Sequence, residues 1–362
     1  MPARDDGRLG PSTRAAHAGL PEAAQGEPFL PGPVFAAPYH LQGPADAARY
    51  DYGRYENPGW DRLEAALGEL EGGDVLAFPS GMAAVTAVLV AVLGRGDVLV
   101  APSDGYPAVR AIASEHLEPR GVEVRFAPTD ERAVRGAVDG ATLVWVESPS
   151  NPHLDVLDIA ALATDVHAAG ATLAVDNTLA TPLGQRPLEM GADISMASAT
   201  KYVTGHSDLL MGYVAVRDTA RLEALRAWRR MTGSIPGPFE AWLAHRSLGT
   251  MAVRFERQLA NAEAITAFLR GRDDVAGARW PGLGAVVCFD LGTEARAQAF
   301  LSACELVAEA TSFGGIHTSA ERRARWGTDA VGEGFIRLSA GIEDAPDLIA
   351  DLRRALDAAA KT

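Results

Sequence analysis

The sequence is almost without lysine. Lysine occurs only at positions 201 and 361, and arginine supplies every other fixed positive charge. A lysine amine can lose its proton and attack a carbonyl carbon, which a guanidinium group cannot do. Lys201 ends an apolar run and precedes the polar stretch Gly205-His-Ser-Asp, a strand-to-loop passage. Lysine scarcity alone leaves two interpretations of Lys201 equally open, a chance survivor at the end of a helix or strand and a Schiff-base lysine.

Cysteine, clustered histidine and long apolar runs are also lacking. Cys288 and Cys304 form neither a disulfide framework nor a metal-ligand spacing, so we interpret them as small core residues. His206 and His245 have no second ligand at a suitable offset, so no metal site is expected. No apolar run approaches the ~20 residues that span a bilayer. The first 26 residues have no apolar core, so we expect no signal peptide and a cytoplasmic protein.

The formal net charge of −14 and the pI near 5.0 argue against nucleic acid and anionic membranes as partners. A chain of 362 residues can bury a large core. One large domain with a smaller one is therefore the natural expectation.

Strand and helix patterns alternate from Trp60 onward. Continuous apolar strands are predicted at 98–101, 122–126, 143–147, 172–176, 194–197 and 213–216. Helices are predicted at 61–70, 81–93, 106–117, 130–138, 159–168 and 219–228. This alternation predicts an α/β domain with a doubly wound, mostly parallel sheet that helices cover on both faces.

Breaks in composition divide the chain into three predicted parts. Residues 1–50 are rich in Pro, Gly and Ala and are expected to form an extended arm. Residues 51–235 form the large domain, which ends at the Gly- and Pro-rich run near 231–238. Residues 236–362 are predicted as a smaller α+β domain. In this domain we expect helices at 239–269, 294–304 and 344–359 and strands at 286–291 and 335–339.

Three predicted strands end in polar residues. Glu147 leads into Ser-Pro-Ser-Asn151, Asp176 leads into Asn177-Thr178, and the strand at 194–197 leads into Ser198-Ala-Thr200-Lys201. Ligands of open α/β sheets lie beyond the carboxyl ends of the strands. A lone acid there is more often a turn residue, but here an acid, a hydroxyl pair and the rare lysine share one edge.

A helix start near this edge adds a weaker signal. Ser80-Gly81-Met82 enters the predicted helix at 81–93. Ser80 alone fits a simple N-cap better. In the functional interpretation, free N–H groups of the first turn hold a phosphate, and Gly81 allows its close approach.

Together these stretches resemble the pyridoxal-phosphate (PLP) enzymes of cysteine and methionine metabolism, among them cystathionine γ-lyase, cystathionine γ-synthase and methionine γ-lyase. The resemblance runs from Thr13 to the C-terminal helix. Its strongest stretch is Ser198-Ala-Thr-Lys-Tyr-Val-Thr-Gly-His-Ser-Asp208. Supporting stretches are Tyr52-Gly-Arg-Tyr-Glu-Asn-Pro, Ser80-Gly-Met-Ala-Ala, Glu147-Ser-Pro-Ser-Asn-Pro, Ala174-Val-Asp-Asn-Thr and Arg337-Leu-Ser-Ala-Gly-Ile-Glu. The resemblance implies PLP as cofactor and fold type I, the aspartate-aminotransferase-like fold.

The resemblance also implies a task for each matched residue. Lys201 would bind PLP covalently and carry protons, Asp176 would pair with the ring nitrogen, and Tyr106 would stack on the ring as a second catalytic residue. The phosphate would be held by Ser80, Gly81, Met82, Ser198 and Thr200, and by Tyr52 and Arg54 from a neighbouring subunit. Arg337 would grip the substrate α-carboxylate with help from Asn151 and Ser312. A homotetramer with active sites shared between paired subunits follows.

Departures from the family concern the distal part of the substrate. Relatives that act on cystathionine usually have a glutamate where this chain has Thr311, and His317-Thr318 replaces a Glu-Ser pair. Pro107 follows Tyr106 where the family has glycine, the cysteine typical of methionine γ-lyases is absent, and the loop at 280–283 is short. We therefore expect activity spread over cystathionine, homocysteine and similar γ-thio amino acids.

The sequence predicts a C–S lyase of the cystathionine γ-lyase type that acts on a small amino acid. A γ-synthase, which adds a thiol to the same kind of intermediate, shares every residue named above, and a methionine γ-lyase is the next alternative. A cofactor-free Schiff-base aldolase would need neither Asp176 nor Ser80-Gly81 and is disfavoured. A binding protein without catalysis is the most distant alternative.

Overall fold

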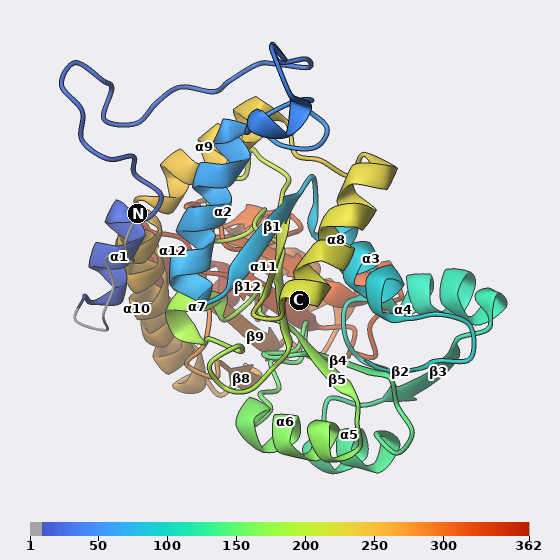
Figure 1. Ribbon diagram of the computed structural model, residues 1–362. Coiled ribbons are helices and arrows are strands. Elements are labelled where there is room, and N and C mark those ends of the chain that lie inside the picture. The colour runs from blue at the N-terminus through green and yellow to red at the C-terminus, as the bar shows by residue number, and fades with distance from the viewer. Residues whose placement is uncertain (1–8, 362) are drawn as a thin grey trace.

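The computed structural model describes residues 9–361, which form two β-sheets and their covering helices (Figure 1). The larger sheet has seven strands in the order β1-β7-β6-β5-β4-β2-β3. Its strands are β1 (Asp74–Phe78), β2 (Val98–Pro102), β3 (Glu123–Ala127), β4 (Leu143–Glu147), β5 (Thr172–Asp176), β6 (Ile194–Ala197) and β7 (Gly212–Val216). Neighbouring strands in the part of the sheet that runs β6-β5-β4-β2-β3 are all parallel, which confirms the predicted mostly parallel sheet.

Two features of this sheet differ from the prediction. β7 runs antiparallel to both β6 and β1, because residues 198–211 reverse the chain without a crossover helix. β1 was not predicted. It is a short strand directly after the glycine pair Gly72-Gly73 and lies at the edge of the sheet.

Helices cover both faces of the seven-stranded sheet, as the continuous apolar strands predict. They are α2 (Pro58–Glu71), α3 (Gly81–Val92), α4 (Pro107–Ile112), α5 (Glu131–Ala137), α6 (Ile159–Ala168), α7 (Thr181–Gly184) and α8 (Thr219–Thr232). Trp145 of β4 packs with α3 and α8 on one face, whereas Val144 and Val146 pack with α5 and α6 on the other. After α4 the chain continues as a π-helical turn (Ala113–Leu117) and a 3-10 turn (Glu118–Arg120).

The segment before α2 is mostly irregular and runs along the outside of the molecule (Figure 1). It contains the helix α1 (Pro11–His17) and the 3-10 turn η1 (Ala45–Ala47), neither of which the extended-arm prediction included. Pro11 starts α1, and the helix buries Ala15 against the core. Residues 1–8 of the predicted arm lie outside the described residues.

The second sheet has five strands in the order β10-β11-β12-β9-β8. They are β8 (Ala276–Arg279), β9 (Val286–Asp290), β10 (Ala308–Glu309), β11 (Ser319–Arg322) and β12 (Phe335–Ser339). Only β9 and β12 were predicted, since the other three lack a continuous apolar run. Every strand of this sheet follows residue 275 and every strand of the larger sheet precedes residue 217, but the domain boundary at 235 stays a prediction.

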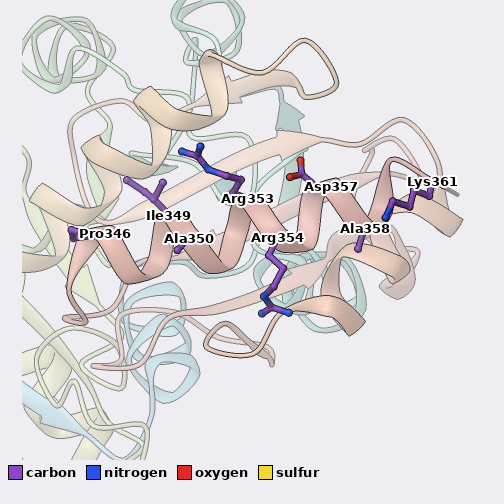
Figure 2. Close-up of a pocket in the computed structure, with 8 residues that line it drawn as sticks. All are labelled: Pro346, Ile349, Ala350, Arg353, Arg354, Asp357, Ala358 and Lys361. Carbon is purple, nitrogen blue, oxygen red and sulfur yellow. The ribbon is translucent and has the colours of Figure 1, made fainter.

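Three helices pack with the second sheet or with one another beside it: α10 (Met251–Arg270), α11 (Glu294–Ala303) and α12 (Ala345–Ala359). The helix before them, α9 (Pro238–Leu248), packs mainly against α2. The helical segment predicted at 239–269 consists of two helices, α9 and α10, separated at Gly249-Thr250, where two poor helix formers follow each other. α12 packs one face on the core, while its outer face carries Arg353, Asp357 and the nearby Lys361 (Figure 2). No helix among residues 9–361 is both long and apolar enough to cross a membrane.

Candidate active site

One cavity of about 410 Å³ lies at the carboxyl ends of β4, β5 and β6. The loop before β11 and a residue of β12 close it from the second sheet. Its lining residues are Ser80, Gly81, Met82, Val85, Tyr106, Glu147, Asn151, Asp176, Thr178, Met196, Ser198, Thr200, Lys201, Leu210, Thr311, Ser312, Phe313, Arg323 and Arg337. The cavity thus brings together the polar strand ends and the helix start that the sequence predicted to share one edge.

Lys201 lies in the turn that follows β6. Its Nζ donates a hydrogen bond to Ser312 Oγ at 2.6 Å and lies 4.9 Å from the centre of the Phe313 ring. Burial and the nearby positive charge of Arg337 lower the pKa of Lys201 to about 8. A pKa this low leaves a substantial fraction of neutral amine near neutral pH, as a nucleophile or a general base requires.

Two acids lie side by side at the ends of neighbouring parallel strands, since Glu147 of β4 is in register with Asp176 of β5. Asp176 Oδ1 accepts hydrogen bonds from the N–H group and the hydroxyl of Thr178, at 3.0 and 2.5 Å. Glu147 accepts one hydrogen bond, from the Tyr106 N–H at 2.9 Å.

The pKa values of the two carboxyls are shifted to different extents by their surroundings. Burial raises the pKa of both, and the charge of Asp176 raises the pKa of Glu147 further. Thr178 and Lys201 oppose this effect at Asp176 because they stabilise its charged form. Of the two carboxyls, Asp176 is thus the one whose charged form is better stabilised.

The start of α3 forms a narrow cradle at one end of the cavity. Ser80 caps the helix through its hydroxyl, which accepts from the Ala83 N–H at 3.1 Å. A Cβ on Gly81 would lie 2.8 Å from Ser198 Cβ, so only glycine fits between the helix start and the turn before Lys201. The first-turn N–H groups of Gly81 and Met82 and the Ser198 hydroxyl thus surround a space suited to an anion.

Thr200 lines the cavity but its hydroxyl is already engaged. It donates to the Met211 carbonyl at 3.0 Å and accepts from the Met211 N–H at 2.9 Å. These bonds fix the turn that carries Lys201.

Arg337 of β12 enters the cavity from the second sheet. Its Nη1 donates to Asn151 Oδ1 at 2.6 Å, and its Nη2 donates to the Ser312 carbonyl at 3.3 Å and to Glu321 Oε1. The Ser312 backbone has φ of 82°, an uncommon conformation for a residue with a side chain. This conformation allows Ser312 to contact Lys201 with its hydroxyl and Arg337 with its carbonyl.

Three predicted site residues lie at the mouth or outside the cavity. Thr311 lines the mouth, where it is exposed. Tyr52 and Arg54 do not line the cavity of their own chain. Arg54 lies against the rings of Tyr52 and Tyr55, and its Nη1 donates to the Arg230 carbonyl at 2.5 Å.

Several residues in the cavity wall or directly behind it were not predicted. Thr178 could have been found, because a hydroxyl two residues after a strand-end acid commonly bonds back to it. Glu321 and Arg323 gave no signal, since they belong to a polar stretch with no apolar pattern and reach the site only through tertiary packing. Among the described residues, no group of three or more His, Cys, Asp and Glu is placed to hold a metal ion.

These residues fit PLP. The cavity offers the Lys201 amine, whose pKa is lowered to about 8, and the Asp176 carboxylate. It also offers a glycine cradle at a helix start that suits a phosphate, and Arg337, which suits a substrate carboxylate. Each of these groups matches one chemical part of the cofactor or of an amino acid.

Comparisons with known proteins agree with this fit. The family model described as Cys/Met metabolism PLP-dependent enzyme matches residues 13–357. A Streptomyces coelicolor protein provisionally named cystathionine gamma-lyase is 54% identical over 96% of this chain and 94% of its own. The L-methionine gamma-lyase of Pseudomonas putida is 35% identical over 96% of this chain and 98% of its own. The crystal structure of cystathionine gamma synthase from Xanthomonas oryzae pv. oryzae, in complex with cystathionine, has a TM-score of 0.93 and 33% identity, with 98% of this chain and 99% of that chain covered.

Proposed function

Because the chain belongs to the Cys/Met metabolism PLP-dependent enzymes, we propose that it is a lyase of the cystathionine γ-lyase type. It cleaves the bond between Cγ and sulfur of cystathionine or a related γ-thio amino acid. With one water molecule, cystathionine gives 2-oxobutanoate, ammonia and cysteine. The observation that carries the proposal is the contact of Lys201 Nζ with Ser312 Oγ in a cavity that also holds Asp176 and Arg337.

The chain's own groups divide the work of the reaction. Arg337 binds the α-carboxylate and places Cα of the substrate near Lys201. The Lys201 amine, with its pKa lowered to about 8, removes the Cα proton and later delivers a proton to another substrate atom. When bound, PLP supplies an electron-withdrawing ring that stabilises negative charge on the substrate carbons. Asp176 keeps a negative charge facing the ring nitrogen, and Tyr106 offers an aromatic face for stacking.

Substitution at Cγ is the second candidate function. It is favoured by the likeness to a cystathionine gamma synthase structure that covers 98% of this chain. A synthase uses the same proton movements of Lys201 but admits a thiol in place of water.

A product assay separates the two functions. The PLP-loaded enzyme is supplied with L-cystathionine alone, and 2-oxobutanoate, ammonia and cysteine are measured. A second reaction contains an O-acyl homoserine and cysteine, and cystathionine is measured. Products of the first reaction at the higher kcat/KM support the lyase. Thioether formation at the higher kcat/KM would show that the synthase is the right assignment. If neither reaction gives its product, both proposed functions are wrong.

We also infer that a second copy of the chain completes the site, within a homotetramer. Tyr52 and Arg54 lie outside the cavity of their own chain, and aromatic side chains of the same arm are exposed, with Phe29 81% and Phe35 72% accessible. At the cavity itself Leu210 is 68% and Tyr106 is 44% accessible. Apolar side chains this exposed favour a covering partner.

Complementation between two inactive variants tests the shared site. Arg54→Ala and Lys201→Ala chains, carrying different tags, are co-expressed. Random pairing makes half of the pairs hybrid, and each hybrid has one intact composite site, so about a quarter of the wild-type rate should return. A mixture as inactive as the separate variants would mean that each chain uses its own Arg54.

A further inference from the structure

Arg323 lines the cavity but has no task in the proposed reaction. It follows β11 directly and begins the 3-10 turn η4 (Arg323–Trp326). β11 pairs antiparallel with β12, which places Glu321 in register with Arg337. Arg323 is 7% exposed, and it shares the cavity wall with Thr311 and Arg337.

The guanidinium of Arg323 is held by two acids. Its Nε and Nη2 donate to Asp329 Oδ2 at 2.8 and 2.5 Å, and its Nη1 donates to Glu321 Oε1 at 2.8 Å. Since a guanidinium has five N–H donors, one hydrogen on each Nη has no partner among residues 9–361. The group is therefore fixed in orientation and still able to donate.

The positive and negative groups of this wall lie at different depths from the cavity. Glu321 is shared by Arg323 and Arg337, and with Asp329 the four groups are formally neutral. Only the two arginines line the cavity, however, and the two acids lie behind them. A substrate thus meets two cations at this end.

Thr311 adds no negative charge at the mouth. Its hydroxyl lies 3.4 Å from Glu321 Oε1, to which it can donate. A distal ammonium group therefore finds no carboxylate on this wall, whereas a distal carboxylate finds free N–H donors.

We propose that Arg323 determines substrate specificity by binding a second carboxylate, carried on the group attached to the γ-sulfur. The preferred substrates are γ-thioether amino acids whose distal arm ends in a carboxylate, and arms that end in a lone ammonium are disfavoured. This proposal rests on the proposed lyase function for its substrate class, since Arg337 is taken to hold the α-carboxylate.

Three homocysteine thioethers of similar size test the proposal. S-(2-carboxyethyl)-, S-propyl- and S-(2-aminoethyl)-L-homocysteine differ only at the distal end, and release of 2-oxobutanoate gives kcat/KM for each. A charge-assisted hydrogen bond in a neutralised cluster corresponds to about a tenfold preference for the carboxyethyl over the propyl compound. Arg323→Gln should reduce this ratio towards one. Arg325→Gln removes an exposed arginine two residues away and should leave the ratio as in the wild type.

A binding measurement separates this proposal from the lyase function. 2-Aminooctanedioate and 2-aminooctanoate copy the carboxyethyl and propyl compounds without a cleavable sulfur bond. Calorimetry on the PLP-loaded enzyme should give about tenfold tighter binding of the diacid, lost in Arg323→Gln. If no thioether releases 2-oxobutanoate but this preference is found, the lyase function fails and the carboxylate site stands.

Two results would overturn the proposal. An equal loss of kcat/KM for all three thioethers in Arg323→Gln would place Arg323 on the α-carboxylate with Arg337. A carboxylate preference that Arg323→Gln does not change would place the distal group elsewhere. The melting temperature of each variant is compared with the wild type, and Arg323→Lys, which keeps the charge, should retain part of the preference if the variant fold is intact.

Discussion

The two lysines of this chain lie in opposite surroundings. Lys201 is largely enclosed, contacts the Ser312 hydroxyl and faces the positive charge of Arg337. Lys361 lies exposed beyond the end of α12, beside a shallow surface hollow (Figure 2). The same side chain is thus a solvated surface group in one place and a candidate nucleophile in the other. The difference comes from burial and neighbouring charge, which act on the charged form of the amine.

The largest expected effect comes from removing each lysine in turn. Lys201→Ala should lower kcat by about ten thousandfold, because it removes both the covalent link to PLP and the general base. Lys361→Ala should have the wild-type rate. Borohydride reduction followed by peptide mapping should place the pyridoxyl group on Lys201. A label on Lys361 would contradict the assignment of Lys201 as the lysine that binds PLP.

The next effect concerns the acid near each lysine. Asp176→Asn keeps the shape of the side chain and removes its charge, so kcat should fall roughly a hundred- to a thousandfold while PLP still binds. Asp357→Asn, on the outer face of α12, is the matched control and breaks only an exposed ion pair with Arg272. Near-normal activity of Asp176→Asn would show that Asp176 has only a structural role, as a hydrogen-bond partner of Thr178.

The pH dependence of cofactor attachment sharpens the comparison further. The pKa of Lys201 is lowered to about 8, so its neutral amine becomes more abundant as pH rises towards that value and is the main form above it. Attachment of PLP to the apoenzyme, followed by absorbance, should therefore speed up about tenfold per pH unit below pH 8 and level off above it. The same curve is expected for Lys361→Ala. A rate that still rises above pH 10 would mean that Lys201 is not perturbed.

The smallest effect concerns the mouth of the cavity. A glutamate at position 311 would offer a carboxylate to a distal ammonium, a contact worth ~1.5–3 kcal/mol. Thr311→Glu should therefore raise kcat/KM for cystathionine by roughly ten- to a hundredfold relative to homocysteine. Thr311→Gln, with similar size and no charge, should not. If the wild type already prefers cystathionine strongly and the glutamate adds nothing, another group binds the distal ammonium.

The central strands and the position of the cavity could be predicted from the sequence. Buried parallel strands are continuous apolar runs, and their carboxyl ends meet at one edge, so Glu147, Asp176 and Lys201 had to lie near one another. The edge strands gave weaker patterns. β11 carries Glu321 and Arg322, which are buried by ion pairs and not by apolar contacts.

The second wall of the cavity could not be predicted in the same way. Arg337 was named because the resemblance to the PLP enzymes of cysteine and methionine metabolism implies its role, and its strand was predicted at 335–339. Arg323 is placed by Asp329 and Glu321, contacts that depend on how η4 folds back on β12. No local pattern encodes such a placement, since it is a property of the tertiary structure.

Lysine scarcity also has a practical consequence for proteolysis. A protease that cuts only after lysine has one site inside residues 9–360, the bond between Lys201 and Tyr202. Tyr202, Val203 and Thr204 are 1%, 3% and 0% exposed, so the folded chain must open locally before this bond can enter a protease. When reclosing is faster than cleavage, the rate of nicking is proportional to the population of the open form. In the apoenzyme the rate of nicking therefore reports how often the segment around Lys201 opens, whereas PLP attached to Lys201 would remove the cleavage site itself.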